Sequence, residues 1–410
     1  MTTTKNNEHK KLNFSNEQEQ SQASLNSAEH EKNQGRKVLN VPNLRFKEFQ
    51  GEWEKKRLEE CVEFLDGLRK PIKSEDRKSE QGLYPYYGAS GIIDYIDGYI
   101  FDGEYILLSE DGANIIDRNY RVAFIAKGKI WVNNHAHVLQ PYDGFDINFL
   151  SETLERLNYA VYNTGTTMPK LNQEVCRNIN LKIPTTKEQN KIGNLLSLLN
   201  ERISTQNKII EDLKKLKSAI IEKLYSEIQG KEYSFGQLFD VVNERNKQME
   251  YSNILSASQE KGMVNRDDLN LDIQFERSNI NTYKIVRKGD YVIHLRSFQG
   301  GFAFSNKLGV CSPAYTILRP NNLLEYGYLS NYFTSQRFIK SLILVTYGIR
   351  DGRSINVDEW LGMKTTIPSK EHQQYIVKAI GSFDRKIESE EAYATHLSKQ
   401  KQYLLRQMFI

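Results

Sequence analysis

The sequence predicts an α+β protein built as a tandem repeat, in which two globular domains alternate with two long helices. The pattern of Ile183 to Ser226 returns 184 positions later, at Ile367 to Ile410, and no insertion is needed over its length. Before each copy, short apolar runs alternate with Gly and Asp turns and with helical segments, as is typical of an α+β domain. A chain of 410 residues is long enough for two such domains, each with its own core.

Residues 1–40 form the first segment of the chain. They are rich in Asn, Gln, Glu, Ser and Lys and hold few large apolar side chains. A segment of this composition cannot bury enough apolar surface to offset the entropy lost on ordering. We therefore expect a disordered polar tail, and we assign it no site.

Residues 41–185 form the first predicted globular domain. Residues 83–141 alternate apolar runs with Gly and Asp, which predicts short strands and turns. Residues 149–162 (FLSETLERLNYAVY) are predicted to form one helix, and residues 179–184 (INLKIP) are strand-like. The start of the domain supplies apolar residues for its core, namely Leu44, Phe46, Phe49, Trp53 and Leu58.

Residues 231–368 repeat the same order of elements and form the second predicted domain. The segment GDYVIHLRSFQGG corresponds to GEYILLSEDGANI, and VCSPAYTILRP corresponds to WVNNHAHVLQP. The two globular domains match only in this frame, whereas the two helices match closely. Two divergent domains on two similar helices can recognise two different things at a fixed separation.

Residues 186–230 and 369–410 are predicted to be long helices with an apolar seam in heptad spacing. About 40 helical residues at ~1.5 Å each give a length of roughly 60 Å. The seam of the first helix is Ile192, Leu196, Leu199, Ile203, Ile210, Leu213, Ile220 and Leu224. That of the second is Ile376, Ile380, Phe383, Ile387, Ala394, Leu397, Leu404 and Met408.

Polar residues interrupt each seam twice, at equivalent places. They are Gln206 and Lys217 in the first helix and Glu390 and Lys401 in the second. A buried polar side chain in a seam costs stability and fixes register, so matching interruptions indicate a specific partner. The alternative is two amphipathic helices that each pack on their own domain.

Cysteine usage and hydropathy exclude several classes of protein. The three cysteines Cys61, Cys176 and Cys311 form no CxxC pair, which argues against a disulfide scaffold or a zinc knuckle. No apolar run approaches the ~18 residues of a membrane span, and the N-terminus lacks the apolar core of a signal peptide. We expect a reduced, cytoplasmic protein. The net charge of +4 is too small to name a partner.

The motifs of common catalytic sites are absent from the sequence. No two prolines are adjacent, so the Asn/Asp-Pro-Pro-Tyr/Phe loop of an amino-methylating enzyme is missing, and no Gly-Lys-Ser/Thr is present to hold a triphosphate. His135 and His137 could ligate a metal from one side of a strand. No third ligand is spaced to complete that site, so we predict neither a catalytic nor a metal centre.

Gly-rich loops carry the side chains that direct readout of DNA bases requires. Arg suits a guanine edge, and Asn or Gln suits an adenine edge. Each of these residues alone is equally consistent with a capped turn or a solvated surface. The candidates in the first domain are Tyr87, Ser90, Asn114, Asn133, Asn134, His135, Thr166, Thr167 and Lys170. The candidates in the second domain are Ser258, Gln259, Arg296, Ser297, Gln299, Arg350 and Arg353.

The charge balance of the first domain works against DNA binding. From Glu52 to Thr166 there are 13 Lys and Arg against 20 Asp and Glu, whereas Lys231 to Asp351 holds 15 against 12. A protein that binds phosphates generally is expected to be basic. Unless its folded surface segregates charge, the first domain needs help from a partner subunit to hold a duplex.

The repeat, the helices and several phrases together resemble the specificity subunit of type I restriction-modification enzymes. The resemblance spans about Val41 to Ile410, and its carriers are specific in combination although weak singly. They are PNLRFKEFQGEWEKKRLEE, YGASGIIDY, GEYILLSEDGANI, IPTTKEQNKIGNLLSLLNERI with KLKSAIIEKLYS, and IPSKEHQQYIVKAIGSFDRKI with KQKQYLLRQMFI.

This resemblance implies a non-catalytic subunit with two target-recognition domains, each reading one half of a bipartite DNA site. The spacer helices at 186–230 and 369–410 would pair as an antiparallel coiled coil and set the length of the unread DNA. Half-sites ~34 Å apart lie on one face of the duplex, and helices of the estimated length can hold two domains at that separation.

The resemblance also implies partners that bring the cofactors. Two methyltransferase subunits would supply S-adenosylmethionine, and two restriction subunits would supply ATP and Mg. This chain itself would bind no cofactor. We expect the seam interruptions, with Asn172 and Asn356, to lie near the subunit contacts.

Two other classes of function remain open on the sequence alone. The first is a self-sufficient DNA methyltransferase or nuclease with an unrecognised active site. The second is a coiled-coil adaptor that binds no nucleic acid. Salt-dependent binding to a duplex separates the adaptor from a DNA-binding subunit, because only phosphate contacts release counterions.

Overall fold

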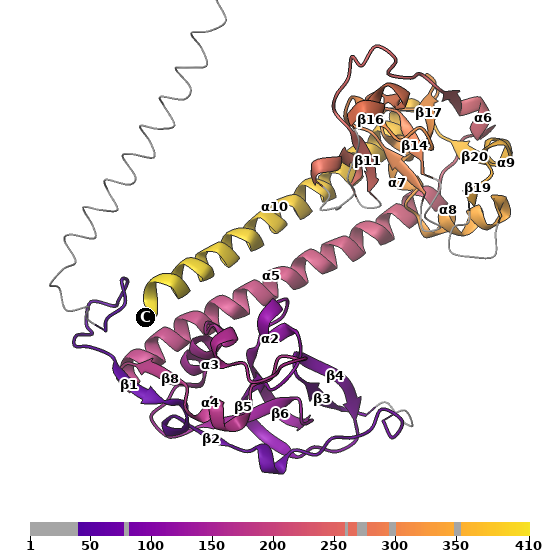
Figure 1. Ribbon diagram of the computed structural model, residues 1–410. Coiled ribbons are helices and arrows are strands. Elements are labelled where there is room, and N and C mark those ends of the chain that lie inside the picture. The colour runs from indigo at the N-terminus through magenta and orange to yellow at the C-terminus, as the bar shows by residue number, and fades with distance from the viewer. Residues whose placement is uncertain (1–39, 78–81, 259–260, 269–276, 295–300, 348–353) are drawn as a thin grey trace, which may run out of the picture. The chain divides into compact units, whose positions relative to one another are not determined.

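The computed structural model describes residues 40–77, 82–258, 261–268, 277–294, 301–347 and 354–410. Apart from its last residue, the predicted tail therefore lies outside the described residues. The chain divides into two compact units (Figure 1), of which unit 1 is Met1–Arg202 with Leu397–Ile410 and unit 2 is Ile203–His396. Both divisions fall inside long helices, so the units do not coincide with the predicted domains, whose boundaries remain a prediction.

A six-stranded sheet forms the body of unit 1. Its strand order is β2-β7-β5-β6-β3-β4, and every pairing is antiparallel except β3 with β6. Successive side chains of a strand point to opposite faces, and in β7 both Val138 and Leu139 are fully buried, so this strand is covered on both faces. The strands are β2 (Val62–Phe64), β3 (Tyr84–Gly88), β4 (Gly91–Ile96), β5 (Phe101–Ser109), β6 (Ala123–Val132) and β7 (Ala136–Pro141).

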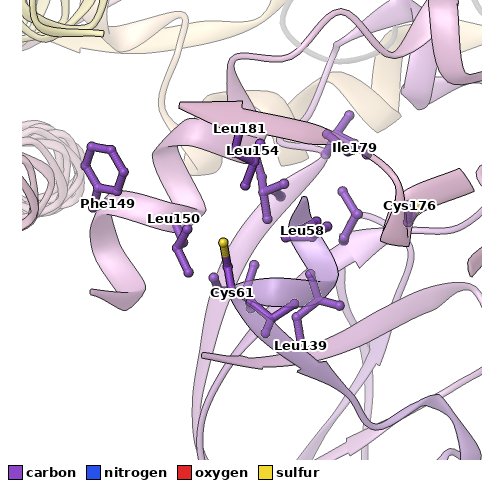
Figure 2. Close-up of a cluster of buried hydrophobic side chains, with 14 of the residues drawn as sticks. Leu58, Cys61, Leu139, Phe149, Leu150, Leu154, Cys176, Ile179 and Leu181 are labelled. Carbon is purple, nitrogen blue, oxygen red and sulfur yellow. The ribbon is translucent and has the colours of Figure 1, made fainter. Parts of the chain in front are cut away.

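Short elements cover this sheet and lead into the first long helix. The strand β1 (Glu54–Arg57) pairs antiparallel with β8 (Asn180–Ile183). A buried cluster lies between the sheet and the helices, and Figure 2 shows Leu58, Leu139, Leu150 and Leu181 converging in it. The remaining elements are η1 (Leu58–Glu60), η2 (Asp66–Leu68), α2 (Asn114–Asp117), α3 (Ile147–Glu155), η3 (Tyr159–Tyr162) and α4 (Gln173–Arg177).

The prediction of one helix over residues 149–162 was wrong. The helix α3 ends at Glu155, and a separate turn of 3-10 helix, η3, begins at Tyr159. Asn158 separates them because it adopts an extended backbone and its side chain accepts a hydrogen bond from the Ala160 N–H. An Asn in this position starts a new helical turn rather than continuing the old one.

Unit 2 repeats the sheet of unit 1 in shorter form. Its four strands lie in the order β10-β17-β14-β15, which corresponds to β2-β7-β5-β6. The register agrees as well, since Phe239 pairs with Pro320 where Val62 pairs with Pro141. The strands are β10 (Phe239–Val242), β14 (Tyr291–Ile293), β15 (Phe302–Phe304) and β17 (Thr316–Pro320). The frame predicted from the sequence is thus confirmed at the level of topology.

The other elements of unit 2 surround this sheet. The strand β9 (Lys231–Ser234) pairs with β20 (Lys364–Ile367) as β1 pairs with β8. Further pairs are β11 (Leu255–Ser258) with β12 (Gly262–Asn265), β13 (Lys284–Val286) with β16 (Gly309–Cys311), and β18 (Thr346–Tyr347) with β19 (Ser354–Ile355). The helices are α6 (Phe235–Leu238), η4 (Arg266–Asp268), η5 (Arg277–Thr282), α7 (Tyr328–Tyr332), α8 (Gln336–Ser341), η6 (Leu342–Val345) and α9 (Val357–Gly362).

The long helices are α5 (Thr186–Ser226) and α10 (Lys370–Met408). In unit 1 the start of α5, at Ile192, shares a core with the end of α10, at Met408. In unit 2 the end of α5, at Ile221, shares a core with the start of α10, at Ile376. The two helices therefore pair antiparallel, and each predicted seam residue is buried or half-buried. This result confirms the predicted coiled coil and excludes two helices packed separately.

A buried glutamine fastens each long helix to the strand before it. Gln189 donates a hydrogen bond to the Pro184 carbonyl (3.0 Å) and accepts one from the Asp146 N–H (3.1 Å). Its counterpart Gln373 donates to the Pro368 carbonyl (3.1 Å) and accepts from the Glu325 N–H (2.7 Å). Because buried backbone groups need partners, each amide fixes the angle at which strand passes into helix.

Candidate nucleic-acid interface

Three turns meet at one edge of the unit 1 sheet. The end of β3, which leads into the first turn, is joined to the segment after β6 by a hydrogen bond from the Asn133 N–H to the Tyr87 carbonyl (3.1 Å). The end of β5 joins the same group, since the Ser109 hydroxyl donates to the Ala89 carbonyl (2.6 Å). We call this region, with residues 87–91, 109–114, 133–135 and 163–171, the polar edge.

The loop of residues 163–170 belongs to the polar edge. The Asn163 carboxamide closes it, accepting hydrogen bonds from the N–H groups of Gly165 (2.9 Å) and Lys170 (2.8 Å). A Cβ on Gly165 would lie 1.8 Å from the Met168 carbonyl oxygen, so the closure requires glycine. The loop is held to the sheet by a hydrogen bond from the Leu171 N–H to the Glu110 carbonyl (2.7 Å).

The structure brings all nine predicted first-domain residues to this edge, but it gives them different surroundings. Ser90, Asn134, Thr166, Thr167 and Lys170 are exposed. His135 is half exposed, and its Nδ1 lies 2.9 Å from the Asp111 carboxylate. These side chains are available to a ligand, and Tyr87 is partly buried beside them.

The side chains of two predicted residues of the polar edge form hydrogen bonds with nearby backbone groups. Asn133 is 5% exposed, and its side-chain oxygen accepts a hydrogen bond from the His135 N–H (2.8 Å). Asn114 forms a pair of hydrogen bonds with the backbone of Tyr120 (2.7 and 3.1 Å) and closes its own loop. Both side chains shape the backbone that presents their neighbours.

Two acidic residues of the edge were not among the predicted site residues. Glu110 forms ion pairs with Arg69 (2.7 Å) and Lys170 (3.4 Å), and Asp111 pairs with His135. They directly follow β5 in the segment GEYILLSEDGANI, so their position after a buried strand was the available signal. The ion pairs of Glu110 hold the Arg69 and Lys170 side chains in place beside it.

His137 does not converge with His135 on a metal site. Its side chain is 1% exposed, with Nδ1 2.7 Å from the Asp66 carboxylate and Nε2 2.8 Å from the Leu171 carbonyl. Burial lowers the pKa of His137, but the Asp66 hydrogen bond and the Cys176 contact outweigh it and raise the pKa to about 10. Burial acts to raise the pKa of Asp66, and the His137 hydrogen bond and charge hold it below its ordinary value.

The polar network of His137 ties the polar edge to the sheet. Asp66 also accepts hydrogen bonds from the Val138 N–H (2.9 Å) and the Gln173 amide (2.9 Å). Within the residues that the structure describes, no group of three His, Cys, Asp or Glu is arranged to hold a metal ion. In the same residues, no helix has the length and apolar character needed to span a membrane.

Of the seven site residues predicted in the second domain, Ser258 is the one that lies within the described residues. Ser258 ends β11, and its hydroxyl accepts a hydrogen bond from the Lys261 N–H (3.3 Å) across the hairpin turn. In the same unit, burial lowers the pKa of His294, which follows β14. The predicted residues Gln259, Arg296, Ser297, Gln299, Arg350 and Arg353 lie outside the described residues.

The predicted partner-binding residues of the seams bond within the chain. Gln206 donates to Glu390, Lys217 pairs with Asp384, and Lys401 pairs with Glu152 (3.0 Å). Asn172 and Asn356, at equivalent positions of the repeat, cap α4 and α9 by accepting hydrogen bonds from the N–H groups three residues on. Their predicted role in subunit contacts stays a prediction.

Comparison with known proteins agrees with this architecture. Residues 50–215 match the family model of the type I restriction modification DNA specificity domain. A putative type I restriction enzyme specificity subunit of Haemophilus influenzae is 36% identical over 148 residues, which cover 36% of this chain and 37% of that protein. The EcoprrI specificity subunit of Escherichia coli is 26% identical over 177 residues, or 43% of this chain and 42% of that protein.

The matched stretches thus span less than half of either curated relative. A solved structure extends the likeness to nearly the whole fold. The specificity subunit of a type I restriction-modification system from M. genitalium matches with a TM-score of 0.60 and 16% identity, over 90% of this chain and 99% of that chain. Residues 50–215 are thus similar to a type I restriction modification DNA specificity domain, parts of the chain are similar to type I specificity subunits, and the fold is shared with the solved specificity subunit.

Proposed function

We propose that this chain is the non-catalytic subunit that selects the DNA target of a type I restriction-modification complex. Its two globular heads, residues 41–185 and 231–368, each read one half of a bipartite site. The spacer helices 186–230 and 369–410 set the distance between the halves. The observation that carries the proposal is the repetition of one sheet order, β2-β7-β5-β6 and β10-β17-β14-β15, on two antiparallel helices.

The polar edge of the first head is the surface that we assign to DNA. Asn134, His135 and Lys170 are exposed there on a backbone held by Asn133 and Glu110. Amide and imidazole groups on a fixed backbone can read base edges, and Lys can contact phosphate. In the second head we assign the same role to Ser258 with Gln259, Arg296, Ser297, Gln299, Arg350 and Arg353.

The partners supply what this chain lacks. We propose that two methyltransferase subunits, carrying S-adenosylmethionine, dock on the spacer helices, and that two restriction subunits bring ATP and Mg. Their docking surface would include Asn172, Asn356 and the exposed residues on either side of the seam of each long helix. The assembled complex would act on cellular DNA in the cytoplasm, and partner subunits would offset the acidic balance of the first head.

Methylation mapping tests the proposal directly. Cells that carry this chain with its methyltransferase partner should show one bipartite motif, with two short specified halves and an unspecified spacer of fixed length. Purified chain with DNA, S-adenosylmethionine and Mg²⁺ should neither methylate nor cut. A motif without a spacer, or activity from the chain alone, would contradict the assignment.

A further inference from the structure

One buried carboxylate joins the first head to both long helices. The Glu152 side chain, on α3, is 3% exposed. Its Oε1 accepts hydrogen bonds from Arg121 Nη1 (2.9 Å), Asn200 Nδ2 (3.0 Å) and Lys401 Nζ (3.0 Å). We call these four residues the junction site. Arg121 belongs to the head, Asn200 to α5 and Lys401 to α10, so three separate segments meet on one oxygen.

The charges of the junction site depend on one another. Lys401 is 16% exposed, and only Glu152 carries negative charge among the four residues. A buried charge without a partner is strongly destabilising, whereas a hydrogen-bonded pair is tolerated. Burial acts to raise the pKa of Glu152, and Arg121 and Lys401 hold it below its ordinary value, so the carboxyl is ionised.

The repeat places a similar pair in unit 2, with the charge on a different residue. Lys401 corresponds to Lys217, and Asn200 corresponds to Asp384, each 184 positions away. In unit 2, Lys217 forms its ion pair with Asp384, so the carboxylate belongs to the helix itself. In unit 1, the same helix position carries the neutral Asn200, and the head supplies the carboxylate.

The two heads also differ at one position, and there the acidic residue belongs to the first head and the amide to the second. In the frame that aligns NFLSETLERLNYAV with GYLSNYFTSQRFIKSL, the residue after the shared Leu-Ser is Glu152 in the first head and Asn331 in the second. Acid and amide are thus exchanged between head and helix. The first end of the helix pair combines an acidic head with a neutral helix position, and the second end combines a neutral head with an acidic helix position.

We infer that this exchange determines which head fits which end of the helix pair, and that Glu152 is the positioning residue of the first head. A head with Asn at this position would leave Lys401 without a carboxylate at the first end. A head with Glu would bring a second carboxylate toward Asp384 at the other end. A head that replaces residues 41–185 therefore needs an acidic residue at position 152. If it has none there, α5 must carry an acidic residue at position 200.

An isosteric exchange tests this inference in the full chain without DNA. Glu152→Gln removes the only carboxylate of the junction site, and Asn200→Asp places a second carboxylate beside the first. Each single variant should lower the thermal midpoint by several degrees. Glu152→Gln with Asn200→Asp moves the charge from head to helix, as in unit 2, and should recover most of the loss. The amide introduced on α3 can then donate a hydrogen bond to the carboxylate introduced on α5.

A matched control separates charge relocation from net charge. Glu201→Gln with Asn200→Asp has the same net charge as the exchange variant. It keeps Glu152 beside the carboxylate introduced on α5, because the acid that it removes is the exposed Glu201. This control should stay as unstable as Asn200→Asp alone.

Two outcomes would overturn the inference. The first is an exchange variant whose thermal midpoint falls by the sum of the decreases seen in the two single variants. The second applies if Glu152→Gln yields no folded protein: recovery of folding on adding Asn200→Asp then supports the inference, and failure to recover overturns it.

The result does not depend on the proposed function. The exchange variants report on the fit between head and helices, whereas methylation mapping reports on DNA recognition. A chain that failed to recognise DNA would still give an interpretable result for the junction site.

Discussion

Gln206 of α5 donates a hydrogen bond to the side chain of Glu390 of α10 and to its backbone carbonyl (3.3 Å), and Glu390 is the residue 184 positions later. Each residue therefore contacts its own counterpart in the other repeat. Because the pair is polar and lies in an apolar seam, it distinguishes this register from a shift by one heptad.

The two buried glutamines at the helix starts make a testable pair. Replacing Gln189 or Gln373 by Ala leaves the carbonyl of Pro184 or Pro368, and one backbone N–H, without a partner. Each substitution should reduce the free energy of unfolding by about 1–3 kcal/mol. Chemical denaturation of the full chain measures this loss.

Gln374→Ala provides the control for this prediction. Gln374 is the exposed neighbour of Gln373 and should change the free energy of unfolding by less than about 0.5 kcal/mol. Equal losses for Gln373→Ala and Gln374→Ala would show that the buried amide contributes nothing specific.

The C-terminal aromatic residue completes the core of unit 1. Phe409 stacks on Phe149 at 5.2 Å and meets the edge of Trp53 at 6.3 Å. Phe409→Ala should cost about 3 kcal/mol of stability, since it leaves a cavity among large side chains. Hydrogen exchange should show the loss in the amides of unit 1 around α3.

Ile410→Ala is the matched control at the chain end, because Ile410 is 40% exposed. Ile410→Ala should leave amide hydrogen exchange in unit 1 unchanged. Uniform loss of protection across both units after Phe409→Ala would argue against a local role of this residue. In unit 2, Tyr225 holds the position equivalent to Phe409 and packs on Tyr332 at 5.3 Å.

The order of the domains and the pairing of the long helices could be predicted because periodic and repeated sequence patterns determine them. Heptad spacing identifies Ile192 and Ile376 as seam residues, and the fixed offset of 184 aligns Asn172 with Asn356. Apolar runs place β5 and β14 in corresponding positions. Such patterns report on burial, which dominates the energetics of folding.

The polar contacts could not be predicted in the same way. Glu152 and Lys401 are 249 positions apart, and Asp66 and His137 are 71 apart, so no local spacing relates them. Whether an Asn reads a base or holds a loop depends on its neighbours in space. Asn133 and Asn134 are adjacent in sequence, yet the first is buried and the second exposed.

The buried pair of His137 and Asp66 makes the stability of unit 1 depend on pH. The folded state raises the pKa of His137 from 6.5 to about 10, so its stabilisation is complete below pH 6.5 and is lost as pH rises toward 10. The folded state lowers the pKa of Asp66 below 3.8, so its stabilisation is present above that pH and is lost in stronger acid.

His137→Gln should therefore reduce the thermal midpoint most between about pH 4 and 6.5, and progressively less toward pH 10. Midpoints of the native chain and the variant, measured side by side at each pH, isolate this group from other titrations. A difference that stays constant from about pH 6 to pH 10 would mean that His137 is not held as a cation in the folded state.

Asn134 offers a direct test of base readout by the first head, since it is exposed on a turn that Asn133 holds in place. In a complex with the proposed methyltransferase partner, Asn134→Ala should weaken binding to the specific duplex by about 1–3 kcal/mol and relax one position of one half-site. Stability should not change, whereas Asn133→Ala should lower the thermal midpoint. Asn43→Ala, exposed in the first head and outside the polar edge, is the control and should leave the methylated motif intact. If Asn134→Ala altered both half-sites, the two heads would not be independent readers, because a contact confined to the first polar edge can change only the half-site that lies against it.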